Sequence, residues 1–255
     1  MRRMLGLLRH VDSLLRGRFT RRDDLLAGRI TLPTHSLTTA GVLLGCAYGL
    51  FMGLYAVLRS EHPSVEQLLA TIVKVPLLFL ATLCVTFPSL YVFSALANTR
   101  LTAAQTLRLL LAAITVNLAL LASFGPVTAF FTLSTDSYPF LVVLNVLFFA
   151  IAGFAGLMFL RRVLDTVFTP ASAPDDANDT DDAPRPPPLP RRAADAAVGR
   201  RVFTIWTVTY GLVGAQMGWI LRPFIGTPTQ EFTFFRPRDA HFFAGLRDAL
   251  RALFS

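Results

Sequence analysis

Long runs of apolar residues, separated by short polar or basic stretches, dominate residues 36–160, and a further run lies near the end of the chain. We predict membrane-spanning helices at about 36–58, 64–97, 102–126, 139–160 and 202–224, because ~20 apolar residues in a helix cross a bilayer. Ser64 to Gln67 and Thr102 to Gln105 have the spacing of capping boxes and mark two helix starts. The predicted fold is an all-α polytopic membrane protein with five transmembrane helices.

The segments outside the spans differ in composition. Residues 1–35 are basic and carry apolar residues at helical spacing, which predicts an amphipathic cytoplasmic arm on anionic lipid or against a partner. Residues 36–168 would form a four-span bundle and 201–226 the fifth span. Residues 169–200 are acidic and then proline-rich, which predicts a disordered cytoplasmic linker with a polyproline II stretch. Residues 227–255 end in an amphipathic helix that would lie on the outer surface or pack back onto the spans.

Composition and charge support the membrane interpretation and give an orientation. The chain is 53% hydrophobic, only 16% charged, and has a mean hydropathy of +0.54. The net charge of +8 comes from basic residues at the ends of apolar runs, so it does not indicate nucleic-acid binding. With the N-terminus inside, the inner segments hold seventeen Arg and the outer ones six. The positive-inside rule therefore predicts a cytoplasmic N-terminus and an outer C-terminus. Of the 24 basic residues all but Lys74 are Arg, a bias that suggests a GC-rich bacterial genome, so we expect a bacterial inner membrane.

Glycines mark two helix faces. Gly41, Gly45, Gly49 and Gly53 recur at every fourth position of the first span, like a glycine zipper, and Gly214 and Gly218 share a face of the last span. Such faces let helices approach closely in lipid. The sequence leaves open whether the partner of the first face is in the same chain or in a second copy, as in a homo-oligomer. Trp219 and Arg222 follow and are predicted at the outer interface.

The spans contain few polar side chains able to do chemistry: Lys74, Asn117, Asn145 and Gln216. At a rise of ~1.5 Å per residue, all four would lie roughly 9–12 Å below the outer surface. We expect the three amides to pair in one polar layer across helix interfaces. Lys74 would join that layer or extend its ammonium group to the outer headgroups, and the second alternative is preferred.

Motifs for catalysis or metal binding are missing from the sequence. Cys46 and Cys84 lie singly in apolar runs, and His10, His35, His62 and His241 all fall outside the spans. We therefore predict no enzyme activity, no metal and no cofactor. In the linker, Pro187, Pro190 and Arg192 match a PxxPxR pattern of the kind that SH3 folds bind, although a simple spacer is the stronger interpretation.

The five-span plan and the Pro- and Phe-rich stretch 74–96 resemble the Yip family of small membrane proteins. The chain lacks the Asp-Leu-Tyr-Gly-Pro element of that family and has a longer linker before the last span. Residues 214–226 and 234–243 are also similar to stretches in bacterial integral membrane proteins without an assigned activity. The resemblance implies a non-catalytic membrane-organising or trafficking-adaptor role. We thus expect a scaffold that binds lipid and a protein partner, with a small channel or transporter as the alternative.

Overall fold

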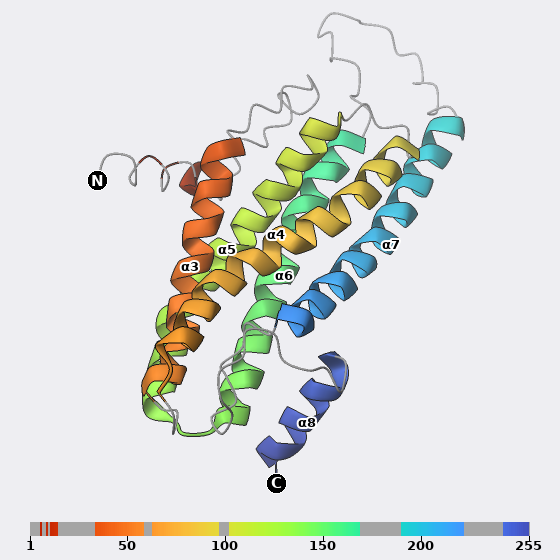
Figure 1. Ribbon diagram of the computed structural model, residues 1–255. Helices are drawn as coiled ribbons and strands as arrows, with labels where there is room; N and C mark the ends of the chain where they lie inside the picture. Colours follow the sequence, from red (N-terminus) through yellow and green to blue (C-terminus); the bar gives the residue numbers. More distant parts are fainter. Residues whose placement is uncertain are drawn as a thin grey trace, which may run out of the picture.

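The computed structural model describes residues 6, 9, 11–14, 34–58, 63–96, 102–168, 190–221 and 242–254. From Thr34 onward, this part of the chain is helical apart from short connections (Figure 1). The helices are α3 (Thr34–Leu58), α4 (Val65–Leu96), α5 (Ala103–Ser134), α6 (Tyr138–Phe168), α7 (Pro190–Leu221) and α8 (Phe242–Phe254). Four stretches among the described residues are long and apolar enough to cross a membrane: Thr34–Leu58, Val65–Val92, Ala103–Ser134 and Tyr138–Leu164. The all-helical class and four of the predicted spans are confirmed.

The long helices run side by side along one axis, with consecutive helices in opposite directions (Figure 1). Helix α3 makes its most extensive contacts with α5 and α4, while α6 packs on α5 and α7 packs on α4. The short helix α8 lies beyond the C-terminal end of α7 and contacts α6 (Figure 1). Helix α4 therefore contacts α3 on one side and α7 on the other.

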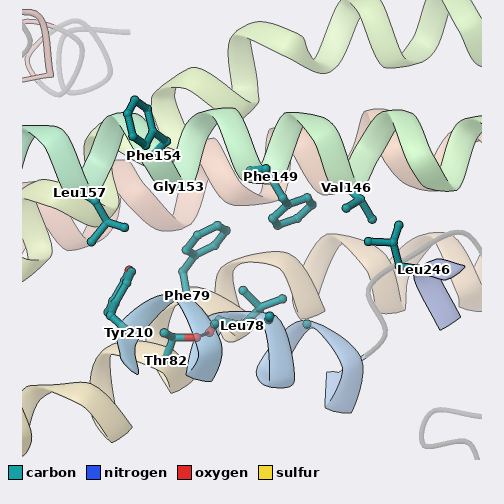
Figure 2. Close-up of a pocket in the computed structure, with 15 residues that line it drawn as sticks. Leu78, Phe79, Thr82, Val146, Phe149, Gly153, Phe154, Leu157, Tyr210 and Leu246 are labelled. Carbon is teal, nitrogen blue, oxygen red and sulfur yellow. Dashed lines mark hydrogen bonds between the residues drawn. The ribbon is translucent and has the colours of Figure 1, made fainter. Parts of the chain in front are cut away.

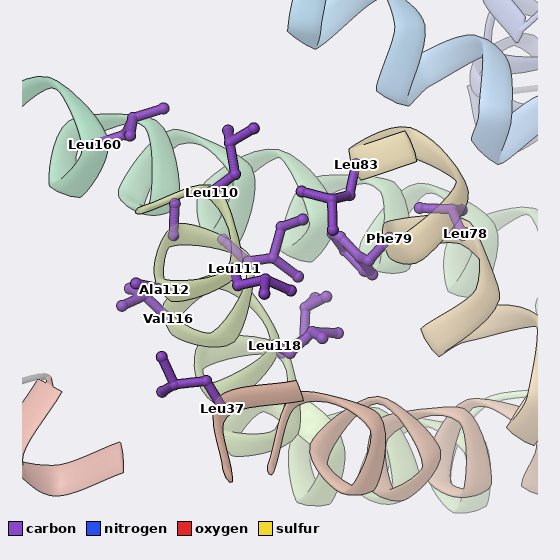
Figure 3. Packing of buried hydrophobic residues seen from close by; sticks show 14 of the residues in the cluster. Leu37, Leu78, Phe79, Leu83, Leu110, Leu111, Ala112, Val116, Leu118 and Leu160 are labelled. Carbon is purple, nitrogen blue, oxygen red and sulfur yellow. The ribbon is translucent and has the colours of Figure 1, made fainter. Parts of the chain in front are cut away.

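Leucines from α3, α5 and α6 fill the centre of the bundle. Leu37, Leu118 and Leu160 are almost fully buried and belong to one continuous cluster (Figure 3). The outer faces carry large apolar side chains that stay exposed on the protein itself: Leu43, Leu50, Val73, Phe130 and Phe154. Water would penalise so much exposed apolar surface, whereas lipid tails do not. The bundle is thus apolar inside and outside, as expected of a protein in a bilayer.

Of the two predicted capping boxes, the one at Thr102 is fully formed and the one at Ser64 is only half formed. The Thr102 hydroxyl accepts a hydrogen bond from the Gln105 backbone N–H, and the Gln105 side chain accepts one from the Thr102 N–H. This confirms the second capping box. At the start of α4 the Ser64 hydroxyl accepts from the Gln67 N–H at 3.1 Å, whereas the Gln67 amide donates to Thr71. The Gln67 side chain is thus turned along α4.

The predicted end of the third span is wrong. Helix α5 does not stop at Gly125-Pro126 but continues to Ser134, and only residues 135–137 separate it from α6. Most of residues 127–138, which lie between the predicted third and fourth spans, are therefore helical. A proline inside a transmembrane helix is tolerated because neighbouring helices and side chains satisfy the freed backbone groups. Gly125 contributes here, since a Cβ at this position would overlap the Phe51 ring of α3. Pro139 occupies the first turn of α6, where a proline is well tolerated.

The predicted linker also ends earlier than expected. Helix α7 begins at Pro190, so residues 190–200 are helical and the polyproline II stretch does not extend through Arg192. Proline is well tolerated in a first helical turn, and the alanine-rich residues that follow favour a helix. Residues 169–189 of the linker lie outside the described part of the chain. In the N-terminal arm, the described Val11 and Leu14 are buried, and Leu14 joins the core of the bundle.

Candidate functional site

Glycines of α3 bring this helix into backbone contact with α4. A Cβ at position 49 would lie 2.8 Å from the Ile72 Cα, and one at position 45 would lie 3.1 Å from the Pro76 Cβ. A Cβ at position 53 would lie 2.7 Å from the Leu68 side chain. The first of these distances is too short for any real Cβ, so only glycine permits this approach at position 49. The glycine face of the first span thus packs within one chain, with Gly41 directed toward Leu118 and Thr115 of α5.

The glycines of α7 pack more loosely than the sequence suggested. Positions 214 and 218 face α4, where a Cβ would lie 3.9 Å from the Thr82 side chain and 3.8 Å from that of Leu78. A Cβ at Gly211 would have no neighbour within 4 Å among the described residues. These glycines therefore leave free volume between α7 and its neighbours instead of a tight helix contact.

One predicted amide has a partner across the bundle that the sequence did not suggest. The Tyr48 hydroxyl of α3 donates a 2.6 Å hydrogen bond to the Asn145 Oδ1 of α6. The Asn145 Nδ2 donates to the Leu141 carbonyl at 2.7 Å, so both polar atoms of this side-chain amide have partners. Both Tyr48 and Asn145 are fully buried. The Tyr48–Asn145 hydrogen bond therefore joins α3 to α6 inside the bundle.

Asn117 lies elsewhere in the bundle. A Cβ added to Gly156 of α6 would be 3.3 Å from the Asn117 Cβ, so Asn117 lies level with Gly156. Eleven residues of α6 separate Gly156 from Asn145, which is about 16 Å along the helix axis. The structure therefore does not bring the two amides into one layer. The depth of Asn117 was misjudged because α5 runs to Ser134 and not to Gly125.

Lys74 lies near the level of the Tyr48–Asn145 bond, because Gly45 lies beside Pro76 and Gly49 beside Ile72, whereas Gln216 lies further along α4. Gly214 lies beside Thr82 and Gly218 beside Leu78, so the half-buried Gln216 is level with the α4 turn between those residues. Lys74 lies one turn beyond Leu78, away from Gln216. Only 3% of Lys74 is exposed, so its side chain lies inside the protein and does not extend to the outer headgroups as preferred from the sequence.

The remaining buried hydroxyls have partners in their own helices. Threonines donate to the carbonyl four residues earlier: Thr71, Thr82, Thr86, Thr115, Thr128 and Thr132. This local bond satisfies a polar side chain without help from water or a second helix. These threonines are structural, and they do not by themselves indicate a binding site. By contrast, the buried Asn117 Oδ1 has no hydrogen-bond partner among the described residues.

A wide pocket separates α6 from α7. Its volume is about 480 Å³, and its walls come from α4, α6 and α7, with Leu246 of α8 at one end (Figure 2). Phe79 of α4 and Phe149 of α6 stack with ring centroids 5.9 Å apart and form one side of it. Tyr210 and Leu157 stand at the end opposite Leu246 (Figure 2). Almost the whole lining is apolar, and three glycines of α7, Gly211, Gly214 and Gly218, contribute to it.

Sequence reasoning missed several residues that contact across helices. The Trp206 indole N–H donates to the Ser89 hydroxyl at 3.2 Å and joins α7 to α4. Trp206 also lies against Tyr210, with ring centroids 5.2 Å apart. A single Trp or Tyr in an apolar run does not show which residue it will hydrogen-bond. Ser89 is 117 positions from Trp206, and Asn145 is 97 positions from Tyr48. By its residue type alone, Trp206 is a large ring with one hydrogen-bond donor, which usually finds a partner when it is buried.

Some predicted residues lie where the structure gives no side-chain detail. Pro190 is the first residue of α7, and the backbones of Arg192 and Trp219 are helical there, but their side chains are outside the described part. Pro187 and Arg222 are also outside it. The interface and linker-recognition roles of these residues stay predictions. Within the described residues, no group of three or more His, Cys, Asp or Glu could hold a metal ion.

Comparisons with protein-family models, curated proteins and solved structures find no match to this chain. The resemblance to the Yip family therefore stays a prediction.

Proposed function

We propose that this protein is a non-enzymatic integral membrane scaffold or adaptor, built as a five-helix bundle in a bacterial inner membrane. The observation that supports this role best is the contact of the Gly45 and Gly49 backbone with α4. Because this glycine face is used within the chain, α3, α4 and α5 form a closed unit. Large side chains such as Tyr48, Met52 and Leu121 are fully buried in that unit. A rigid bundle of this kind can carry cytoplasmic segments that recruit partners.

Helix α7 would be the fifth span. It has 32 residues, and Ile205, Val208 and Leu212 form an exposed apolar stripe along it, with Val208 67% exposed. The opposite face holds the buried Trp206 and packs against α4. A helix with one face on protein and an apolar face exposed is suited to a position at the edge of a bundle in lipid.

The orientation follows from charge. Arg108 and Arg161 lie near the helix ends that meet where α3 begins and α4 ends, and Arg201 lies about a third of the way along α7 from that same end of the bundle. The opposite end of the described spans carries Glu66 and Asp136 instead. By the positive-inside rule, the arginine-rich end is cytoplasmic, which puts the arm and linker inside and α8 outside.

Labelling of single cysteines in cells tests this topology. In a variant with Cys46 and Cys84 replaced by alanine, new cysteines at Ser172, Asp136 and Ser255 would report the linker, the α5–α6 loop and the C-terminus. We expect an impermeant thiol reagent outside the cell to label positions 136 and 255 but not 172. Equal protection of 172 and 255 would contradict a fifth span.

A transporter is the second candidate, because Lys74 is buried within a predicted span, where ionisable groups often mark a substrate path. Solute or ion flux into liposomes separates the two functions. The scaffold proposal expects no flux above that of empty liposomes. Flux that is lost in Lys74→Ala, while Arg108→Ala keeps it, would contradict the scaffold and favour transport.

A further inference from the structure

The pocket between α4, α6 and α7 has the size of a ligand site. Its volume of about 480 Å³ falls within the range of ~300–1,000 Å³ that is usual for small-molecule pockets. The free space exists because helix positions that face it lack side chains. A Cβ at Gly153 of α6 or Gly211 of α7 would have no neighbour within 4 Å among the described residues. Ordinary side chains at these two positions would occupy part of the volume.

The lining favours apolar ligands, because Thr82 and Tyr210 contribute its only side-chain hydroxyls among the described residues. No charged side chain is among the described residues that line the pocket. The Thr82 hydroxyl donates to the Leu78 carbonyl within its own helix at 2.8 Å, so it is already used. A buried water needs two to four polar partners, and an apolar cavity stays dry or takes an apolar guest. The occupant must therefore be largely hydrocarbon.

The mouth of the pocket faces the apolar surroundings of the bundle. Phe154 lines the pocket and is 66% exposed, and Gly211 on the facing helix is exposed as well. Direct contact between α6 and α7 is slight compared with that between α4 and α7. In a bilayer, lipid tails therefore have direct access to the pocket between α6 and α7.

Positively charged side chains lie on α8, the helix that reaches the pocket through Leu246. Helix α8 carries the exposed Arg247, which follows Leu246 in the sequence, and the exposed Arg251 about one turn further along. Asp248 pairs with Arg247 at 3.1 Å and offsets one of the two charges. An amphipathic helix with arginines on its polar face is suited to the headgroup level of a membrane. A lipid with its tail in the pocket would have its headgroup beside these arginines.

We propose that the α4–α6–α7 pocket binds one acyl chain of an anionic phospholipid, with the phosphate headgroup at α8. This site is independent of the scaffold role, because a transporter of the same fold would contain it too. Bound lipid would join α7 and α8 to the rest of the bundle and fill the space that Gly153, Gly211 and Gly214 leave open.

Native mass spectrometry tests the site. Protein reconstituted in vesicles of phosphatidylglycerol and phosphatidylcholine is extracted into mild detergent, and retained lipid is counted. We expect one phosphatidylglycerol per chain, and about tenfold lower occupancy in Gly153→Leu/Gly211→Leu, since a tenfold change corresponds to ~1.4 kcal/mol of binding free energy. The matched control is Val208→Phe, which enlarges an exposed α7 residue outside the pocket and should keep the lipid.

Three results would overturn the proposal: a wild-type chain without retained lipid, equal occupancy in the glycine double variant, or an adduct that is not a phospholipid. Equal retention of phosphatidylcholine, unchanged in Arg247→Gln/Arg251→Gln, would overturn the assignment of the headgroup to α8.

A fluorescence measurement avoids dependence on the folding of the double variant. In Trp219→Phe, Trp206 is the single remaining tryptophan, and it lies against Tyr210 at the end of the pocket. Lipids brominated on the acyl chain should quench Trp206, and the quenching should persist after exchange into unlabelled lipid. Full recovery on the timescale of bulk exchange would show that no chain is held.

Discussion

The Tyr48 hydroxyl donates a 2.6 Å hydrogen bond to the Asn145 side chain, between residues 97 positions apart in the sequence. Both residues are fully buried, and the bond joins α3 to α6 in the interior of the bundle. The same pair connects two features that the sequence showed separately, the glycine-faced first span and an intramembrane amide. It also explains why Asn145 is tolerated in the core.

Removing the Tyr48 hydroxyl should measure how much this hydrogen bond contributes to the free energy of unfolding. In Tyr48→Phe, the Asn145 Oδ1 loses its donor, and we expect the free energy of unfolding to fall by about 1–2 kcal/mol. Tyr91→Phe is the control, because Tyr91 is exposed on α4. Unfolding in a detergent titration provides the measurement. An equal effect of the two substitutions would show that the bond contributes nothing.

Asn117 should behave differently from Asn145. Its Oδ1 is buried without a partner among the described residues, and an unsatisfied buried group costs about 1–3 kcal/mol. Replacement by leucine removes that cost, so Asn117→Leu should leave stability unchanged or raise it. Asn145→Leu should destabilise the same bundle, because it removes the acceptor of Tyr48. A loss of stability in Asn117→Leu as large as in Asn145→Leu would contradict this difference.

The α3–α4 contact should be intolerant of a single methyl group. A Cβ at Gly49 would lie 2.8 Å from the Ile72 Cα, and overpacking of this kind costs about 1–3 kcal/mol. Gly211→Ala is the matched control in an open position, where higher helix propensity should raise stability by up to ~1 kcal/mol. Because the glycine face packs within the chain, the mass of the detergent-solubilised protein should be the same in Gly49→Ala and wild type. Dissociation of a wild-type oligomer by Gly49→Ala would place that face between subunits.

The contact between Trp206 and Ser89 should report the attachment of α7 to α4. In a Trp219→Phe background, Ser89→Ala removes the acceptor of the indole N–H, so the emission of Trp206 should shift to shorter wavelength. We expect a loss of about 0.5–1.5 kcal/mol in the free energy of unfolding. Ser123→Ala is the control, because that hydroxyl is exposed on α5 and donates to the Ala119 carbonyl. An unchanged emission spectrum in Ser89→Ala would mean that α7 does not dock on α4 in this way.

The sequence by itself determined the membrane class, four spans and most helix starts. Hydrophobic length and capping residues act locally, within a few residues of where they stand, so Thr102 and Gln105 could be interpreted without knowledge of the rest. Helix ends were less predictable. Pro126 breaks helices in water, but α5 continues through it because surrounding helices stabilise the turn. That single difference moved the predicted depth of Asn117.

Only the tertiary structure decided which residues meet. Glycine spacing on α3 predicted a close helix contact, but the identity of the partner, α4, depends on how the whole bundle packs. The partnership of Tyr48 with Asn145 and the pocket between α6 and α7 likewise have no local signature. Packing in a bilayer depends on the shape and polarity of surfaces from several helices at once, because lipid provides no hydrophobic drive to separate inside from outside. A sequence pattern therefore identifies a helix and its distinctive faces, whereas the neighbour of each face is a property of the folded bundle.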